Sequence, residues 1–232
     1  GFLGSAEAVS AVAEILSDYP DVPLVSYLPN LGWLDDDQAQ PYLEAFRELI
    51  LPATEVLVGN HKTLTDFLLP DWDSDRPASP RELAVAAAEH GTRYVLVTGV
   101  MLPPKGSTGQ FIDNVLASAQ GALTGEKFEL FEVGFVGAGD TLSAALAALL
   151  GLQSELQAAV GEALQFLDQS LDAGFRPGMG NIVPDRFLWA LPPEDEQAAA
   201  EAGAGPDAPD DEDDDSAAPE RPTPPGGPRR VH

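Results

Sequence analysis

The chain of 232 residues contains no cysteine and few basic residues, and both absences limit what it can do. Without cysteine there is no disulfide, no thiolate metal site and no cysteine nucleophile, which fits a reducing, cytoplasmic compartment. Twelve lysines and arginines stand against 38 aspartates and glutamates, a net charge of −26 at pH 7. Because affinity for nucleic acid comes largely from cations that neutralise phosphates, this balance argues against nucleic acid as a partner.

Long apolar segments are also missing from the sequence. No apolar run approaches the roughly 18 residues that a membrane-spanning helix needs. The first residues show no charged region followed by an apolar signal segment. We therefore expect an acidic cytoplasmic protein that has no membrane partner.

The C-terminal 40 residues differ in composition from the rest of the chain. Residues 193–232 carry 12 acids, three basic residues and eight prolines, but no aromatic residue. Such a segment cannot bury enough apolar surface to offset its chain entropy. We therefore predict a folded domain at residues 1–191 and a disordered, acidic, proline-rich tail at residues 192–232. The tail is either a solvated extension or an arm that recruits a basic partner.

Apolar residues in the first hundred positions are spaced as in strands that alternate with helices. Strands are expected at residues 23–28, 55–59 and 94–100, and helices at residues 5–18, 35–50, 61–69 and 80–90. Strands joined by helical crossovers at this spacing form a parallel sheet that is covered on both faces. The predicted fold class is therefore α/β.

The pattern changes after the third strand. Residues 103–109 predict a mobile loop, because two prolines and two glycines cannot continue a helix or a strand. Two antiparallel edge strands and two closing helices are expected at residues 110–116, 127–133, 141–150 and 156–171. Gly174 follows the last helix, where it could form a left-handed cap.

The segment Gly134–Leu146 carries the pattern that most strongly indicates chemistry. Gly137, Ala138 and Gly139 are small enough for the backbone to approach a ligand, and a helix follows directly. The first N–H groups of a helix have no intrahelical partner, so they favour an anion such as a phosphoryl group. Asp140 at the helix entrance could accept a proton from a substrate hydroxyl as that oxygen attacks phosphorus. A structural alternative stays open, since glycine-rich turns often begin helices and aspartate often caps them.

Taken in order, these motifs resemble the hydroxymethylpyrimidine/phosphomethylpyrimidine kinase and pyridoxal kinase branch of the ribokinase-like superfamily. The resemblance covers nearly all of residues 1–191 and rests on Leu3-Gly4-Ser5, Asn60, Val95–Gly99, Gly137–Asp140 and Gly178–Asn181. It implies a ribokinase-like three-layer α/β/α domain with a mostly parallel sheet. Relatives begin with a strand and a glycine-rich substrate-binding segment ahead of the Leu-Gly-Ser motif. We therefore expect the fold to be incomplete at the N-terminus, and this fragment alone to be weakly active or inactive.

The resemblance also implies roles for particular residues. Asp140 would be the catalytic base, with the anion hole formed by the amides of Gly137, Ala138 and Gly139. The contacts to ATP phosphates and the surroundings of the metal would come from Asn60, Thr98 and Gly99. ATP and Mg²⁺ would be the cofactors, and the resemblance allows a homodimer.

Three functions remain open at this level. The first is phosphoryl transfer to the hydroxymethyl group of a small heteroaromatic alcohol, 4-amino-5-hydroxymethyl-2-methylpyrimidine or its phosphate, in thiamine biosynthesis. The second is a pyridoxal kinase of vitamin B6 salvage. The third is a non-catalytic ligand-binding descendant whose tail recruits a partner.

The sequence departs from the family pattern at three places. Thr63 stands where relatives often carry the Glu of an Asn-x-x-Glu motif, and Asp66 is the nearest acid that follows. Leu28-Pro29 ends the first strand in a region where many relatives have Asp-Pro. The metal ligands are therefore unassigned. Asp140 replaces the cysteine common in dedicated hydroxymethylpyrimidine kinases, so the acceptor ring also stays open.

Overall fold

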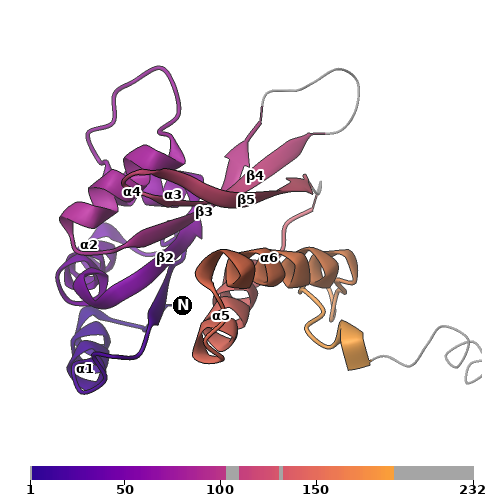
Figure 1. The fold of residues 1–232 in the computed structure, drawn as a ribbon, viewed down its shortest axis with the longest axis horizontal. Helices are drawn as coiled ribbons and strands as arrows, with labels where there is room; N and C mark the ends of the chain where they lie inside the picture. Colours follow the sequence, from indigo (N-terminus) through magenta and orange to yellow (C-terminus); the bar gives the residue numbers. More distant parts are fainter. Residues whose placement is uncertain (1, 103–109, 131–132, 191–232) are drawn as a thin grey trace, which may run out of the picture. The chain divides into compact units, whose positions relative to one another are not determined.

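The structure, a computed structural model, describes residues 2–102, 110–130 and 133–190 and centres on one five-stranded sheet (Figure 1). The strands lie in chain order across the sheet: β1 (Leu24–Leu28), β2 (Thr54–Asn60), β3 (Tyr94–Met101), β4 (Phe111–Ser118) and β5 (Gly121–Glu129). The first three strands run parallel, and the last two form an antiparallel hairpin beside them. The predicted α/β fold with a mostly parallel sheet is confirmed.

Six α-helices among the described residues cover the two faces of the sheet (Figure 1). They are α1 (Ala6–Leu16), α2 (Asp36–Ala45), α3 (His61–Leu68), α4 (Pro80–Glu89), α5 (Ala138–Gly151) and α6 (Leu156–Asp172). A π-helical turn, Phe46–Ile50, continues α2. None of the helices in the described ranges is long and apolar enough to cross a membrane.

The two faces of the sheet build two separate apolar cores. Leu57 of β2 packs in the cluster that includes residues of α1 to α4, whereas its neighbours Val56 and Val58 pack in the cluster formed with α5 and α6. Successive side chains of a strand point to opposite faces, so one apolar strand serves both cores. The sheet is therefore the middle layer of three, as the resemblance implied.

The extent of the last strand corrects the prediction. The sequence predicted a strand at residues 127–133, but β5 is Gly121–Glu129 and follows β4 after a two-residue turn. Gly121 and Gly125 obscured the alternating pattern. Gly125 nevertheless pairs with Val115 of β4 as a strand residue. Glycine is favoured at this position because a Cβ would lie 2.7 Å from the carbonyl oxygen of Asn114.

The predicted left-handed cap at Gly174 is wrong. The helix α6 ends through Ala173, whose φ is −81°, and Gly174 does not have a positive φ. Glycine is required there for space instead. A Cβ at position 174 would lie 2.8 Å from both the carbonyl oxygen of Leu171 and the ring of Phe135. The predicted loop at residues 103–109 and the predicted tail at residues 192–232 lie outside the described residues.

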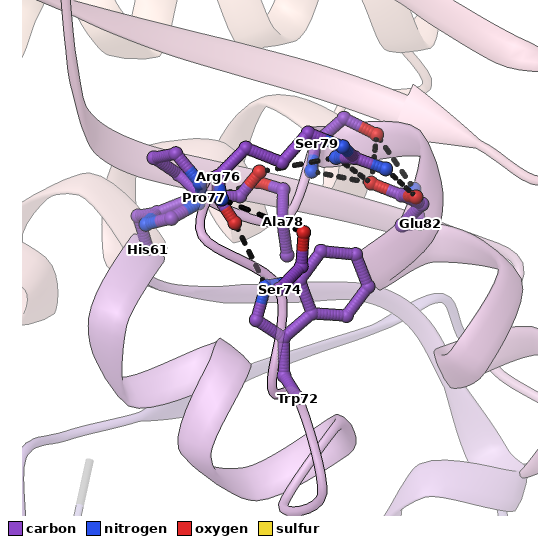
Figure 2. A network of polar contacts seen from close by, with 8 residues as sticks. All are labelled: His61, Trp72, Ser74, Arg76, Pro77, Ala78, Ser79 and Glu82. Carbon is purple, nitrogen blue, oxygen red and sulfur yellow. Dashed lines mark hydrogen bonds and ion pairs between the residues drawn. The ribbon is translucent and has the colours of Figure 1, made fainter.

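A network of polar contacts fixes the connection between α3 and α4 (Figure 2). The Trp72 indole N–H donates to the carbonyl oxygen of Arg76, and the Arg76 guanidinium lies over the Trp72 ring. That guanidinium also donates to both carboxylate oxygens of Glu82. Ser79 and Glu82 form a capping box at the start of α4. The Arg76 and Ser79 hydrogen bonds lower the pKa of Glu82 to about 2.

This network predicts an acid-dependent loss of stability. Glu82 has a lower pKa in the folded chain than in the unfolded chain, so its contribution is present above about pH 4.5 and is lost as the pH falls toward 2. Glu82→Gln should lower the free energy of unfolding by about 1 kcal/mol at pH 6, as for a surface ion pair that also closes a helix cap. Urea unfolding from pH 6 to pH 2 measures this difference, which should shrink toward acid.

Arg76→Gln is the matched control, because it removes the largest cause of the lowered pKa and leaves Glu82 in place. It should reproduce most of the effect. A difference between Glu82→Gln and the unaltered chain that stays constant from pH 6 to pH 2 would contradict the assignment.

Candidate active site

The N-terminus of α5 is closed by a glycine rather than by a polar side chain. Gly137 is the N-cap residue, with a φ of +88° that favours glycine. Side-chain oxygens of Ser5, Asn60, Ser79 and Glu155 accept hydrogen bonds from the first turns of α1, α3, α4 and α6, whereas the N-cap Asp35 of α2 makes no such bond. Within the described part of the chain, the N-cap Gly137 offers no such bond to the first turn of α5, so amides of this turn can face an anion.

Asp140 is the third residue of α5 and is exposed. The sequence predicted a helix from residue 141, so α5 begins three residues earlier than expected. Asp140 is therefore not the N-cap residue, which was the structural alternative. An exposed carboxylate in the first turn lies where a hydroxyl brought to the helix end could reach it.

Tyr27 of β1 packs directly against the backbone of this turn. A Cβ added to Gly139 would overlap Cζ of the Tyr27 ring, so a side chain at position 139 would require the ring to move. Burial raises the pKa of Tyr27, and the negative charge of Asp140 raises it further. The Tyr27 hydroxyl therefore stays protonated at neutral pH and can donate a hydrogen bond beside Asp140.

The glycines of the turn thus have a structural role beyond the one expected from sequence. We predicted that their small size lets a ligand approach the backbone. At Gly139 the space is taken by Tyr27, and a Cβ at Gly137 would lie 2.7 Å from Nη2 of Arg186. The positive φ at Gly137 and the Tyr27 ring at Gly139 thus both favour glycine, whatever ligand the turn holds.

A second polar group lies at the carboxyl ends of β2 and β3. Asn60 and Thr98 are register partners, and a β-bulge follows in β3, where Gly99 has a φ of +70°. The Gly99 N–H donates to Oδ1 of buried Asn114 on β4 at 3.1 Å. A Cβ at Gly99 would lie 2.7 Å from Nδ2 of Asn60. The bulge therefore brings together the three residues that the resemblance assigned to ATP phosphates.

A cleft of about 740 Å³ opens at the ends of β1 and β2. Its walls come from the chain after β1, from α2 and from α3, and they include Tyr27, Asn60, Thr63 and Asp66. This volume is within the range of small-molecule sites. Thr98, Gly99 and Asp140 do not line the cleft. Tyr27 connects the two groups, because it lines the cleft and also packs on Gly139.

The residues around Asn60 have defined partners. Asn60 Oδ1 accepts from the Lys62 N–H, and Lys62 Nζ forms an exposed ion pair with Asp66 at 2.6 Å. The His61 ring hydrogen-bonds to the carbonyl oxygen of Ala78 at 2.6 Å, where its Nε2–H donates (Figure 2). This contact ties His61 to the connection between α3 and α4. Within the described ranges, no group of three or more His, Asp or Glu residues could hold a metal ion.

Sequence reasoning missed three of the residues that build the site: Tyr27, Asn114 and Arg186. Asn114 is a buried polar residue in an otherwise apolar strand, a signal that could have pointed to it. Arg186 was not assigned to the site either, yet its Nε donates to Thr141 Oγ1 of α5 at 2.8 Å. Contacts between residues 45 positions apart leave no periodic trace in a single sequence.

The packing of Tyr27 on the α5 turn predicts that Gly139→Ala lowers the stability of the protein, although Gly→Ala in a helix usually raises it. Gly→Ala inside a helix normally stabilises by up to about 1 kcal/mol. Gly139→Ala should instead destabilise by about 1–3 kcal/mol, because the added methyl overlaps the Tyr27 ring. Chemical denaturation measures the change in the free energy of unfolding.

Two further variants make this test specific. Gly161→Ala in α6 is the matched control: a Cβ there meets nothing within 4 Å, so this variant should be stabilised. In a Tyr27→Ala background, Gly139→Ala should cost less than in the unaltered chain. An equal cost in both backgrounds would contradict the contact.

Comparison with known proteins agrees with the resemblance found in the sequence. A sequence model of the phosphomethylpyrimidine kinase family matches residues 1–185. The thiamine biosynthetic bifunctional enzyme TH1 of Arabidopsis thaliana is 29% identical over 180 residues, which make up 74% of this chain and 32% of the plant enzyme. The chain thus spans about a third of the length of that relative.

Solved structures share the fold. The pyridoxal kinase of Bacillus subtilis, solved as an ADP complex, has a TM-score of 0.67 at 20% identity over 83% of this chain and 70% of its own. A protein from Bacteroides thetaiotaomicron, described as a putative phosphomethylpyrimidine kinase, has a TM-score of 0.62 at 21% identity over 84% and 69%. Because the family model matches residues 1–185, the chain belongs to the phosphomethylpyrimidine kinase family.

Proposed function

We propose that the protein transfers the γ-phosphoryl group of ATP to the hydroxymethyl group of a heteroaromatic vitamin precursor. The family membership supports a vitamin kinase of the phosphomethylpyrimidine and pyridoxal kinase type. The observation that carries the proposal is the start of α5, where an exposed Asp140 lies in the first turn of a helix that has glycine as its N-cap.

The first turn of α5 would stabilise the phosphoryl group during transfer. Negative charge spreads over the equatorial oxygens of this group in the transition state. The amides of Gly137 to Asp140 would face those oxygens as an anion hole, and the positive end of the helix would add to their effect. Preorganised dipoles of this kind need no rearrangement as the charge develops.

Asp140 would act as the base. As the acceptor oxygen forms its bond to γ-phosphorus, the hydroxyl proton passes to the Asp140 carboxylate. The bond between γ-phosphorus and the bridging oxygen breaks, and ADP leaves. The protonated Tyr27 hydroxyl beside Asp140 would help to orient this carboxylate.

The nucleotide would lie along the carboxyl ends of β2 and β3. Asn60, Thr98 and Gly99 converge there, and the ADP complex of the Bacillus pyridoxal kinase supports a nucleotide site in this fold. Mg²⁺ would accompany the nucleotide and neutralise phosphate charge. Mg²⁺ usually keeps several waters and needs only one or two protein oxygens. Asn60 and Asp66 line the cleft with side-chain oxygens, and Asp66 would have to leave its ion pair with Lys62 to bind the ion.

The acceptor would enter the cleft beside Tyr27 and Asn60. We propose the hydroxymethylpyrimidine or its phosphate as the acceptor, because the family model and the plant relative both belong to thiamine chemistry. Pyridoxal is the second candidate, favoured by Asp140 in place of the family cysteine.

The test is ADP release by the complete gene product with hydroxymethylpyrimidine and pyridoxal offered separately. Asp140→Asn should lower kcat by about 10²–10⁴-fold, as the loss of a general base does, and should change the KM for ATP little. Asp172→Asn, the same change at the exposed end of α6, is the control and should turn over normally.

The outcomes separate the candidates. ADP release with one ring identifies the acceptor, and its loss in Asp140→Asn identifies the base. Full turnover by Asp140→Asn would contradict the role of Asp140. If ATP binds but neither ring yields ADP, the protein is a ligand-binding descendant rather than a kinase for these alcohols.

A further inference from the structure

Arg186 contacts the first turn of α5 at two points. Its Nε donates to Oγ1 of buried Thr141 at 2.8 Å, and its Nη2 donates to the carbonyl oxygen of Gly137 at 3.5 Å. Thr141 Oγ1 in turn donates to the same Gly137 carbonyl at 2.8 Å. The guanidinium therefore contacts both ends of the turn that contains Ala138, Gly139 and Asp140.

The backbone that carries Arg186 is held in place from two sides. The N–H of Val136, just before the turn, donates to the carbonyl oxygen of Ile182 at 2.9 Å. The N–H of Asp185 donates to the carbonyl oxygen of Ser170 in α6 at 2.8 Å. The segment 182–186 thus connects the α5 turn to the end of α6, and Arg186 projects from a fixed position.

A cation at this place works against the stability of the helix. The N-terminus of a helix carries partial positive charge, so acidic residues stabilise it and basic residues do not. Asp140 in the first turn offsets part of this charge. An additional guanidinium on the turn becomes favourable when an anion occupies the helix end. The hydrogen bonds to Thr141 and Gly137 hold the guanidinium on the turn, and a bound phosphoryl group would make its charge favourable there.

We propose that Arg186 is a positioning residue for phosphoryl transfer, which holds the Gly137 turn so that the first amides of α5 face the phosphoryl group. The inference rests on the function proposed above. Arg186 acts through Thr141 and Gly137 rather than as the base, and the rigid planar fork of arginine suits contact with two acceptors.

The experiment compares Arg186→Gln, Arg186→Lys and Arg176→Gln in the complete gene product. Arg176 lies in the same C-terminal segment and is exposed, so Arg176→Gln removes the same charge without touching the α5 turn. In Arg186→Gln, kcat should fall about 10–100-fold, while the KM for the ring alcohol stays within about twofold. Arg186→Lys should lie in between, and Arg176→Gln should match the unaltered protein.

Hydrogen exchange and the affinity for AMP-PCP test the positioning role of Arg186 without requiring turnover. In Arg186→Gln, amides in peptides that cover residues 136–142 should exchange about tenfold faster, whereas those of α6 should not change. Affinity for AMP-PCP should fall about tenfold in Arg186→Gln but not in Arg176→Gln.

A second variant tests the route through Thr141. Thr141→Val keeps the shape of the side chain and removes the oxygen that Arg186 contacts. If Arg186 acts through this contact, the double variant loses little more than Arg186→Gln alone, because the two residues act as a unit. Fully additive losses would overturn the positioning role.

The outcomes distinguish the two proposals. If the unaltered protein releases no ADP from either ring, the proposed function fails, and the role of Arg186 is decided by exchange and by affinity for AMP-PCP. Unchanged exchange at residues 136–142 in Arg186→Gln overturns the inference, whatever the turnover. A loss in Arg176→Gln equal to that in Arg186→Gln overturns it too, because net charge would then explain both.

Discussion

The contact between the Tyr27 ring and the backbone at Gly139 is the constraint on which the rest of the site depends. It joins the end of β1 to the start of α5, two segments more than a hundred residues apart in the chain. Because glycine has no side chain, the helix can approach the sheet closely at position 139. The first turn of α5 is thereby fixed at the same end of the sheet as Asn60 and the β3 bulge.

This arrangement places a helix end that favours anions and a cleft of small-molecule size at one end of the sheet. Helix dipoles and a guanidinium lie on one side of Tyr27, and the cleft with Asn60 lies on the other. The parallel strands all end here, which is where α/β folds usually bind ligands. The net charge of −26 repels a phosphorylated ligand. Local dipoles and cations at this end of the sheet would therefore have to attract it.

Much of the fold was predictable because it follows from local periodicity. Strands β1 to β3 and helices α1 to α6 were each predicted within a few residues, since apolar spacing and capping residues such as Ser5 and Ser79 act locally. Glycines were the main source of error. Gly125 and Gly174 serve close approach of distant segments, and a single sequence cannot show which atoms will approach them.

The candidate site was predictable where its residues form a continuous motif, and not where it depends on contacts between residues distant in the sequence. The turn from Gly137 to Asp140 is one continuous motif, and family resemblance supplied Asn60, Thr98 and Gly99. Tyr27 and Arg186 had no assigned role, because each contacts residues far away in the sequence. Tertiary contacts of this kind become visible only in the three-dimensional structure.

The most direct test of this account is a crystal structure of the complete protein with AMP-PCP and the acceptor alcohol. We expect the terminal phosphonate within hydrogen-bond distance of the first amides of α5, and the acceptor hydroxyl beside the Asp140 carboxylate. A terminal phosphonate bound away from α5, for example in the hollow of about 570 Å³ between α3 and α4, would contradict the account.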